Sequence, residues 1–251
     1  METLIQANRL LHIALGFAGL AAWWIPVFTA KGKKVHVWAG RTFAVCAYAV
    51  GASAVLSPTL RMPKALLDGI PFQQLLAEAG FIVFLGYLGI LTLNSVHFGV
   101  RVVRTRRDPA RLDTPFLRLL PWAMPLGSLL VIDLPVAYWS PMSIILLVLA
   151  SLGLLSFRPQ LRYLSEPPRE RMAWFFAHME AMLGAGIAFH TAFLVFGSRV
   201  FFDLSLLGPY NWVPWVLPSV IGIAGGEVWK RSYQRKFGLV PESAPAADAQ
   251  A

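Results

Sequence analysis

Residues 10–30, LLHIALGFAGLAAWWIPVFTA, form a predominantly apolar run that ends at the basic turn Lys31-Gly32-Lys33-Lys34. A transmembrane α-helix needs about 20 consecutive apolar residues, so this run is long enough to cross the hydrocarbon core of a bilayer. A secretory signal peptide has its positive charges before the apolar run and small residues after it, which is the reverse of the order here. We therefore expect the run to be a membrane span that stays in the mature chain.

Six further apolar runs follow along the chain. They cover residues 36–57, 80–100, 116–138, a fifth run that follows Ser140-Pro141 and ends at 157, and then 173–197 and 212–229. The pattern predicts an all-α, polytopic membrane protein with one seven-helix transmembrane domain over residues 1–240. Residues 241–251 are rich in Ala, Pro and small polar residues, so we expect a disordered C-terminal tail.

The composition agrees with a membrane protein. Hydrophobic residues make up 57% of the 251 residues and charged residues 14%, whereas soluble domains have about 45–50% and about 25%. The lone cysteine, Cys46, excludes an intrachain disulfide and a CxxC redox motif. The sequence contains no phosphate loop, GxSxG elbow or HExxH motif, so nothing in it supports an ATPase, a serine hydrolase or a zincin protease.

The distribution of Lys and Arg predicts the orientation. One set of alternate flanks holds eighteen of the 22 basic residues, and the other set holds only Arg9, Arg61, Lys64 and Arg199. Because positively charged flanks stay in the cytoplasm, we predict an outer N-terminus and a cytoplasmic C-terminus in a bacterial inner membrane. The net charge of +9 is then accounted for by membrane flanks, with the lipid bilayer and not nucleic acid as the partner.

Three histidines on three predicted spans lie near the cytoplasmic side. His36 begins the second span, His97 lies about one turn before the end of the third, and His178 lies about one turn into the sixth. Neutral imidazole suits zinc, copper and iron, and three histidines with an open position are typical of a catalytic metal site. We predict that these residues hold a transition metal (zinc, iron or copper) or haem b. For His36, hydrogen bonding to lipid headgroups is an equal alternative.

Other polar residues lie within the predicted spans, where ionisable groups are costly and often functional. His12 and His190 lie in the outer half, so in a haem protein they are candidate ligands of a second haem and of a transmembrane electron path. Asn94 shares a helical face with His97 and Arg101 at spacings i, i+3 and i+7.

Two carboxylates leave further functions open. Asp133 lies in the outer part of the fourth span and Glu180 two residues after His178. With the histidines they could relay protons in a proton-coupled transporter of a small solute, or they could simply pair with Arg118 or Arg41. A non-catalytic accessory protein is the third reading, and whether the chain is an enzyme stays open.

Two outer segments, 59–79 and 201–215, are expected to lie along the membrane interface. Trp and Tyr favour that region, so Tyr210, Trp212 and Trp215 are expected to form an aromatic belt. Small residues mark close helix contacts and make a homodimer through these faces a further prediction. They are Ala177, Ala181, Gly184, Ala185 and Ala188 in the sixth span, and Gly222 and Gly226 in the seventh.

Residues 12–41 combine an early His12 on a Gly-rich span with Lys31-Gly32-Lys33-Lys34-Val35-His36 and Gly40-Arg41. This run resembles an uncharacterised bacterial multi-pass membrane family, the domain-of-unknown-function 2306 group. The stretch from His178-Met179 to Thr191-Ala192-Phe193-Leu194-Val195 resembles it too. The resemblance implies a small polytopic protein of unassigned activity, and it adds emphasis to His36 and His178.

Overall fold

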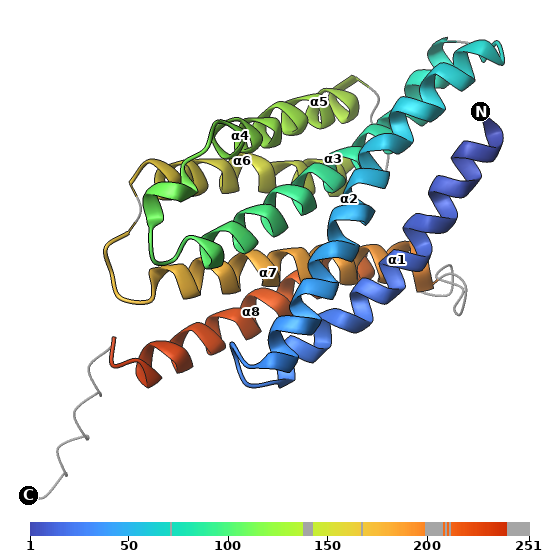
Figure 1. Cartoon of the computed structure of the whole chain (residues 1–251). Coiled ribbons are helices and arrows are strands. Elements are labelled where there is room, and N and C mark those ends of the chain that lie inside the picture. Colours follow the sequence, from blue (N-terminus) through green and yellow to red (C-terminus); the bar gives the residue numbers. More distant parts are fainter. Residues whose placement is uncertain are drawn as a thin grey trace, which may run out of the picture.

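The computed structural model describes residues 1–70, 72–137, 143–166, 168–198, 208, 210 and 212–239. Every regular element in these ranges is helical. The long helices lie side by side in a bundle, with the N-terminus and the end of the last helix at opposite ends (Figure 1). The helices are α1 (Glu2–Phe28), α2 (Lys34–Leu67), α3 (Phe72–Arg104), α4 (Pro115–Leu119), α5 (Ala123–Ala137), α6 (Ser143–Ser165), α7 (Ala173–Ala192) and α8 (Val213–Lys236).

Six stretches of the described chain are helical, long and apolar enough to cross a membrane. They are Glu2–Phe28, Lys34–Leu67, Ile82–Arg104, Pro115–Asp133, Ser143–Ser165 and Ala173–Gly197. They coincide with the first six predicted spans, so the chain is a multi-pass helical membrane protein. Helix α8 covers the seventh predicted run but is not among the six, and the tail 241–251 lies outside the described residues.

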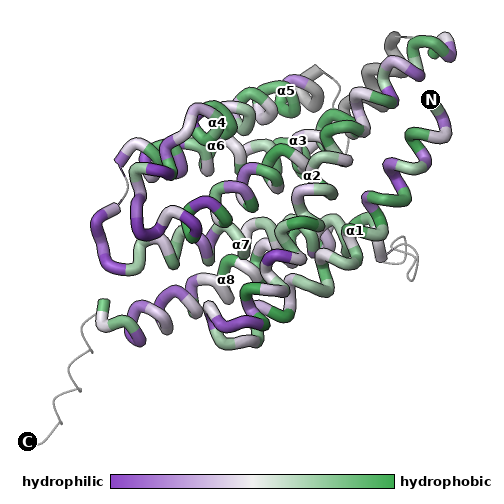
Figure 2. The backbone as a smooth tube through the Cα atoms, viewed as in Figure 1, coloured by the Kyte–Doolittle hydropathy of each residue, from purple (hydrophilic) through white to green (hydrophobic). Residues whose placement is uncertain are grey.

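The outer surface of the bundle is apolar. Only 11% of the most apolar 18-residue stretch of α1 is buried within the protein, because side chains such as Leu10 and Leu11 are exposed. In Figure 2 hydrophobic colour follows the helices, while hydrophilic residues gather in the loops between α1 and α2, α3 and α4, and α6 and α7 and in the last turns of α8. A protein with such an apolar surface needs lipid or detergent around it.

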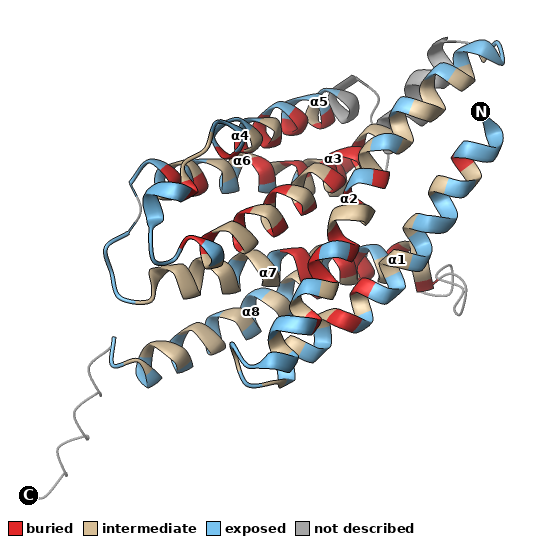
Figure 3. Ribbon diagram, viewed as in Figure 1, coloured by how far each residue is buried: buried red, intermediate tan, exposed pale blue. Residues whose placement is uncertain are grey.

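Helix α3 is the centre of the bundle. It packs against α2, α5 and α7, and buried positions concentrate along it and on the helix faces around it (Figure 3). Its residues contribute to all three clusters of buried apolar side chains, through Val96 in the first, Phe84 and Tyr87 in the second, and Phe98 in the third. Helix α3 thereby joins the α1–α2–α7 side of the protein to the α5–α6 side.

Buried polar groups on α3 are paired with polar groups on α5 and α6. Asn94 Nδ2 donates to Gln160 Oε1 at 2.6 Å, and Gln160 Nε2 donates back to Asn94 Oδ1 at 3.0 Å. The Tyr87 hydroxyl lies 3.0 Å from Ser128 Oγ and donates to the Ala150 carbonyl. Both sites satisfy groups that would be costly to leave unpaired away from water.

Prolines shape two of the spans differently. The fourth is interrupted by a 3₁₀ turn, Leu120–Trp122, which separates α4 from α5 at Pro121. Helix α2 instead runs through Pro58 and Pro63 to Leu67. Within the segment 59–79, residues 59–67 extend α2 and 72–79 begin α3, and its place along the interface stays a prediction. Pro58 lies against Gly86 of α3, where the missing side chain makes room for the proline ring.

The small residues of α8 and the tryptophan before them pack within the chain. A Cβ added at Gly222 would lie 2.4 Å from Ile187 Cγ1 of α7, and Gly226 lies next to Leu183. Trp215 is 6% exposed and packs against Phe84 and Phe196, so its assignment to an aromatic belt is wrong. Tyr210 and Trp212 are exposed, while residues 201–207 lie outside the described ranges. The homodimer stays a prediction.

Candidate functional site

His36 lies in the first turn of α2 and His178 in the second turn of α7, and each ring is held by a main-chain carbonyl of a neighbouring helix. His178 Nδ1 lies 3.0 Å from the Gly99 carbonyl oxygen of α3, and His36 Nδ1 lies 3.3 Å from the Pro26 carbonyl oxygen of α1. Two of the three histidines predicted to form a metal site thus share the same arrangement on two different helices.

The hydrogen bonds of this pair determine which ring nitrogen is free. A carbonyl oxygen only accepts, so Nδ1 of His36 and Nδ1 of His178 both carry a proton and donate it. In the neutral ring Nε2 then keeps its lone pair. Metal-binding histidines show the same arrangement, with one nitrogen held by a carbonyl or carboxylate and the other on the metal.

His97, the third predicted ligand, faces a different part of the protein. Its Nδ1 lies 3.2 Å from the hydroxyl of Tyr48 on α2, and its ring packs edge-on against Phe116 of α4. Asn94, on the same predicted face, turns to Gln160 of α6. Among the described residues, no three His, Cys, Asp or Glu side chains converge as metal ligands, so the three-histidine site stays a prediction.

His12 and His190 lie at different levels of the bundle. His12 Nδ1 is 2.6 Å from Ser53 Oγ, and that hydroxyl donates to the Val50 carbonyl. The His190 ring packs edge-on against Trp23 and Trp24 at centroid distances of 5.0 and 5.2 Å. Trp23 is eleven residues beyond His12, about 16 Å along the helix axis. The structure does not bring the two predicted ligands of a second haem together.

His190 nevertheless has an unusual environment. Its Nδ1 lies 2.7 Å from the Gly186 carbonyl oxygen one turn earlier, and its Nε2 is buried with no hydrogen-bond partner among the described residues. Buried polar atoms are nearly always paired, so such an atom needs an explanation. A ligand bound at Nε2 would be one explanation.

The predicted carboxylates do not lie in a shared interior site. Asp133 is exposed near the end of α5. Glu180 forms a 2.7 Å ion pair with Lys230 of α8. The prediction that it pairs with Arg118 or Arg41 is therefore wrong. Arg118 pairs instead with Asp113. Sequence spacing could not reveal the Glu180–Lys230 pair because it joins two helices fifty residues apart.

Lys31 lies beside the histidine pair. Its Nζ donates to the Pro26 carbonyl at 2.6 Å and to the Val27 carbonyl at 2.9 Å, and it lies 5.6 Å from the ring centroid of Trp229. Burial lowers the pKa of the Lys31 ammonium. Lys31 thus satisfies the last carbonyls of α1 and positions the Pro26 carbonyl that also holds His36.

Sequence reasoning missed Tyr48, Ser53 and Trp23, which orient or enclose histidines. Each lies in an apolar run at about the depth of the histidine it contacts. Their depth in the predicted spans could have identified them as candidates. The direction of their side chains around the helix axis could not be predicted from the sequence.

The fold and these residues define a multi-pass helical membrane protein with half-buried histidines between its helices. No family model, curated protein or solved structure matches this chain. The resemblance to the domain-of-unknown-function 2306 group therefore stays a prediction.

Proposed function

We propose that this chain is a membrane metalloprotein in which His36 and His178 bind a transition metal, with a redox role. The observation that carries the proposal is the shared arrangement of the two histidines. They come from different helices, each has Nδ1 held by a main-chain carbonyl, and each has Nε2 available.

Haem iron is the form of metal that this pair suits best. Two imidazoles would be enough to hold a haem, whereas protein zinc sites take three or four protein ligands. The buried, unpartnered Nε2 of His190 is a third nitrogen that a ligand would satisfy, at a different level of α7. When bound, haem supplies one-electron chemistry; the residues orient it and keep its surroundings apolar.

The test is metal content and the visible spectrum of protein purified in mild detergent without a His tag, from cells supplied with a haem precursor. We expect stoichiometric iron and a Soret band. His36→Ala and His178→Ala should each lose both, because one of the two imidazoles that would hold the iron is missing. His97→Ala and His12→Ala are the matched controls and should keep both.

Zinc or copper without a Soret band would assign the site to a bare ion, provided that the same two substitutions remove it. Wild-type protein without metal, or metal retained in both His36→Ala and His178→Ala, would overturn the proposal. A non-catalytic accessory protein would then be favoured over a proton-coupled transporter, because Asp133 and Glu180 do not share a cavity with the histidines.

We further propose that α8 is a seventh span, with the N-terminus outside and the C-terminus in the cytoplasm of a bacterial inner membrane. Helix α8 exposes Val216, Leu217, Val220, Ile221, Ile223 and Val228, which suits contact with lipid. Its last turn and the N-terminus lie at opposite ends of the bundle (Figure 1). Six spans would place both termini on the same side.

Single-cysteine labelling tests this topology in a Cys46→Ala background, which removes the lone native thiol. Thr3→Cys and Ser232→Cys place new thiols near the two ends. In spheroplasts, a membrane-impermeant maleimide should label Thr3→Cys at once and Ser232→Cys only after lysis. Equal labelling of both before lysis would contradict seven spans.

A further inference from the structure

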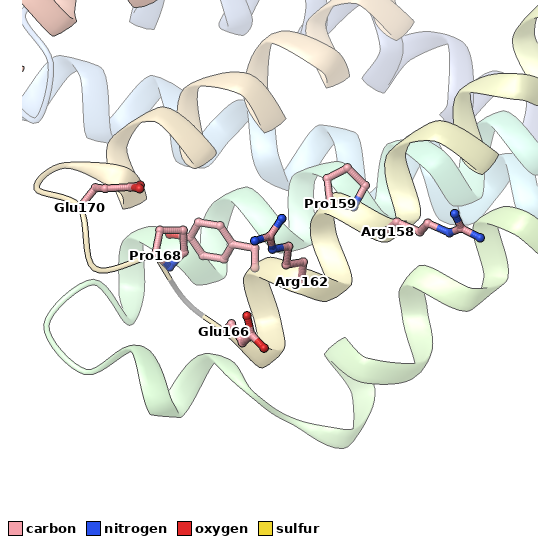
Figure 4. A pocket seen from close by; sticks show the side chains of 7 residues that line it. Arg158, Pro159, Arg162, Glu166, Pro168 and Glu170 are labelled. Carbon is pink, nitrogen blue, oxygen red and sulfur yellow. The ribbon is translucent and has the colours of Figure 1, made fainter. Parts of the chain in front are cut away.

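A pocket of about 560 Å³ opens where α6 ends and the chain turns toward α7. Its lining combines charged residues of both signs with apolar ones, namely Arg158, Pro159, Arg162, Tyr163, Glu166, Pro168 and Glu170. In Figure 4, Arg158, Arg162 and Glu166 follow one another along the end of α6, while Glu170 belongs to the loop before α7. The pocket is separate from the histidine pair and from every group used in the proposed function.

The pocket lies at the depth of lipid headgroups. Helix α6 is a candidate span of 23 residues, about 34 Å long, while the hydrocarbon core is about 30 Å thick and the bilayer with headgroups about 40–45 Å. The apolar part of α6 ends at Phe157, and the charged Arg158, Arg162 and Glu166 follow it. This end of the helix is therefore assigned to the headgroup region, because charged side chains are costly in the hydrocarbon core. The inner wall is firmly held, since Tyr163 packs edge-on against Phe98 of the buried cluster at this end, with 5.4 Å between ring centroids.

The charges in the pocket are free to bind a ligand. At the same end of the bundle, Arg111 pairs with Asp108 and Arg118 with Asp113, and the latter bond lowers the pKa of the Asp113 carboxyl. By contrast, Arg162, Glu166 and Glu170 form no ion pair within the described ranges. Two arginines, Arg158 and Arg162, and two carboxylates thus line the pocket without an ion pair to each other among the described residues.

We infer that this pocket binds the headgroup of a zwitterionic phospholipid that carries a primary ammonium, the phosphoethanolamine type. Arg162 contacts the phosphate, because a guanidinium pairs well with phosphate oxygens. Glu166 and Glu170 accept hydrogen bonds from the ammonium group. An anionic lipid has no ammonium group for the two carboxylates, and a choline headgroup has no N–H to donate, so neither satisfies both halves of the pocket.

The experiment compares phosphatidylethanolamine, phosphatidylcholine and phosphatidylglycerol with the same acyl chains, titrated into delipidated full-length protein in detergent and followed by native mass spectrometry. We expect phosphatidylethanolamine to bind about tenfold tighter than phosphatidylcholine, the effect of one charge-assisted hydrogen bond. Glu166→Gln/Glu170→Gln should remove this preference and leave phosphatidylcholine binding unchanged. Arg162→Gln should weaken both lipids.

The control variant is Arg107→Gln, which removes an exposed arginine outside the pocket and should bind like the wild type. All variants should elute as single species with unchanged melting temperatures, since every substituted residue is exposed. Tighter binding of phosphatidylglycerol, or equal binding of all three lipids, would overturn the inference. Displacement of the lipid by an equal concentration of glycerophosphoethanolamine would also overturn it, since the site would then serve a soluble phosphoester.

Discussion

Gly186→Ala is expected to destabilise the protein by about 1–3 kcal/mol, the usual cost of overpacking a well-packed interior. A Cβ at Gly186 would lie 2.3 Å from Trp23 Cε2 of α1. The indole cannot simply swing away, because its Nε1 donates to the Met182 carbonyl at 3.0 Å. Relief of the clash would have to separate α1 from α7 or break this hydrogen bond.

Gly184→Ala provides the matched control on the same helix. Nothing lies within 4 Å of a Cβ at Gly184, and alanine favours a helix over glycine by about 1 kcal/mol. This variant should be as stable as the wild type or slightly more so. The measurement is thermal and dodecyl sulfate unfolding in one detergent, followed by tryptophan fluorescence. Equal melting temperatures for the two variants would show that α1 and α7 are not packed as described.

Gln160→Leu and Asn94→Leu should each destabilise the protein by about 1–3 kcal/mol, because either change leaves one buried amide without its partner. Asn94 is 2% exposed and Gln160 8%, so water cannot replace the lost hydrogen bonds. The double variant Asn94→Leu/Gln160→Leu should recover most of the loss, since no amide is then left unpaired. The pair thus favours the observed register of α3 against α6 more than it adds to stability.

A double-mutant cycle of the same unfolding measurement gives the coupling energy directly. Thr92→Val is the control on α3, because the buried Thr92 hydroxyl bonds only to the Leu88 carbonyl of its own helix. It should change stability little. Additive losses in the double variant would contradict the reciprocal Asn94–Gln160 pair.

The arrangement of the histidines changes how the chemistry of this protein is understood. Equal depth suggested that His36, His97 and His178 act together, yet of these three only His36 and His178 have Nδ1 held by a main-chain carbonyl. The reason is the direction of each side chain around its helix axis, since the His97 ring turns to Tyr48 of α2 and the His178 ring to Gly99 of α3. A two-ligand site therefore replaces a three-ligand site in the proposal.

The sequence by itself determined the class of protein and the position of six spans. A bilayer requires about 20 apolar residues in a row, and that requirement is local, so it can be counted along the chain. Proline lacks the N–H that the helix needs, which accounts for the break at Pro121, but the same local rule fails at Pro58 and Pro63, through which α2 runs.

Only the tertiary structure decided which side chains meet. The extension of α2 through Pro58 depends on a glycine of α3, the burial of Trp215 depends on Phe84 and Phe196, and the partner of Glu180 is Lys230 of α8. Each contact joins residues far apart in the chain. The hydropathy of a stretch indicates how deep its residues lie in the membrane. The direction of each side chain and the residues it contacts depend on how the helices pack.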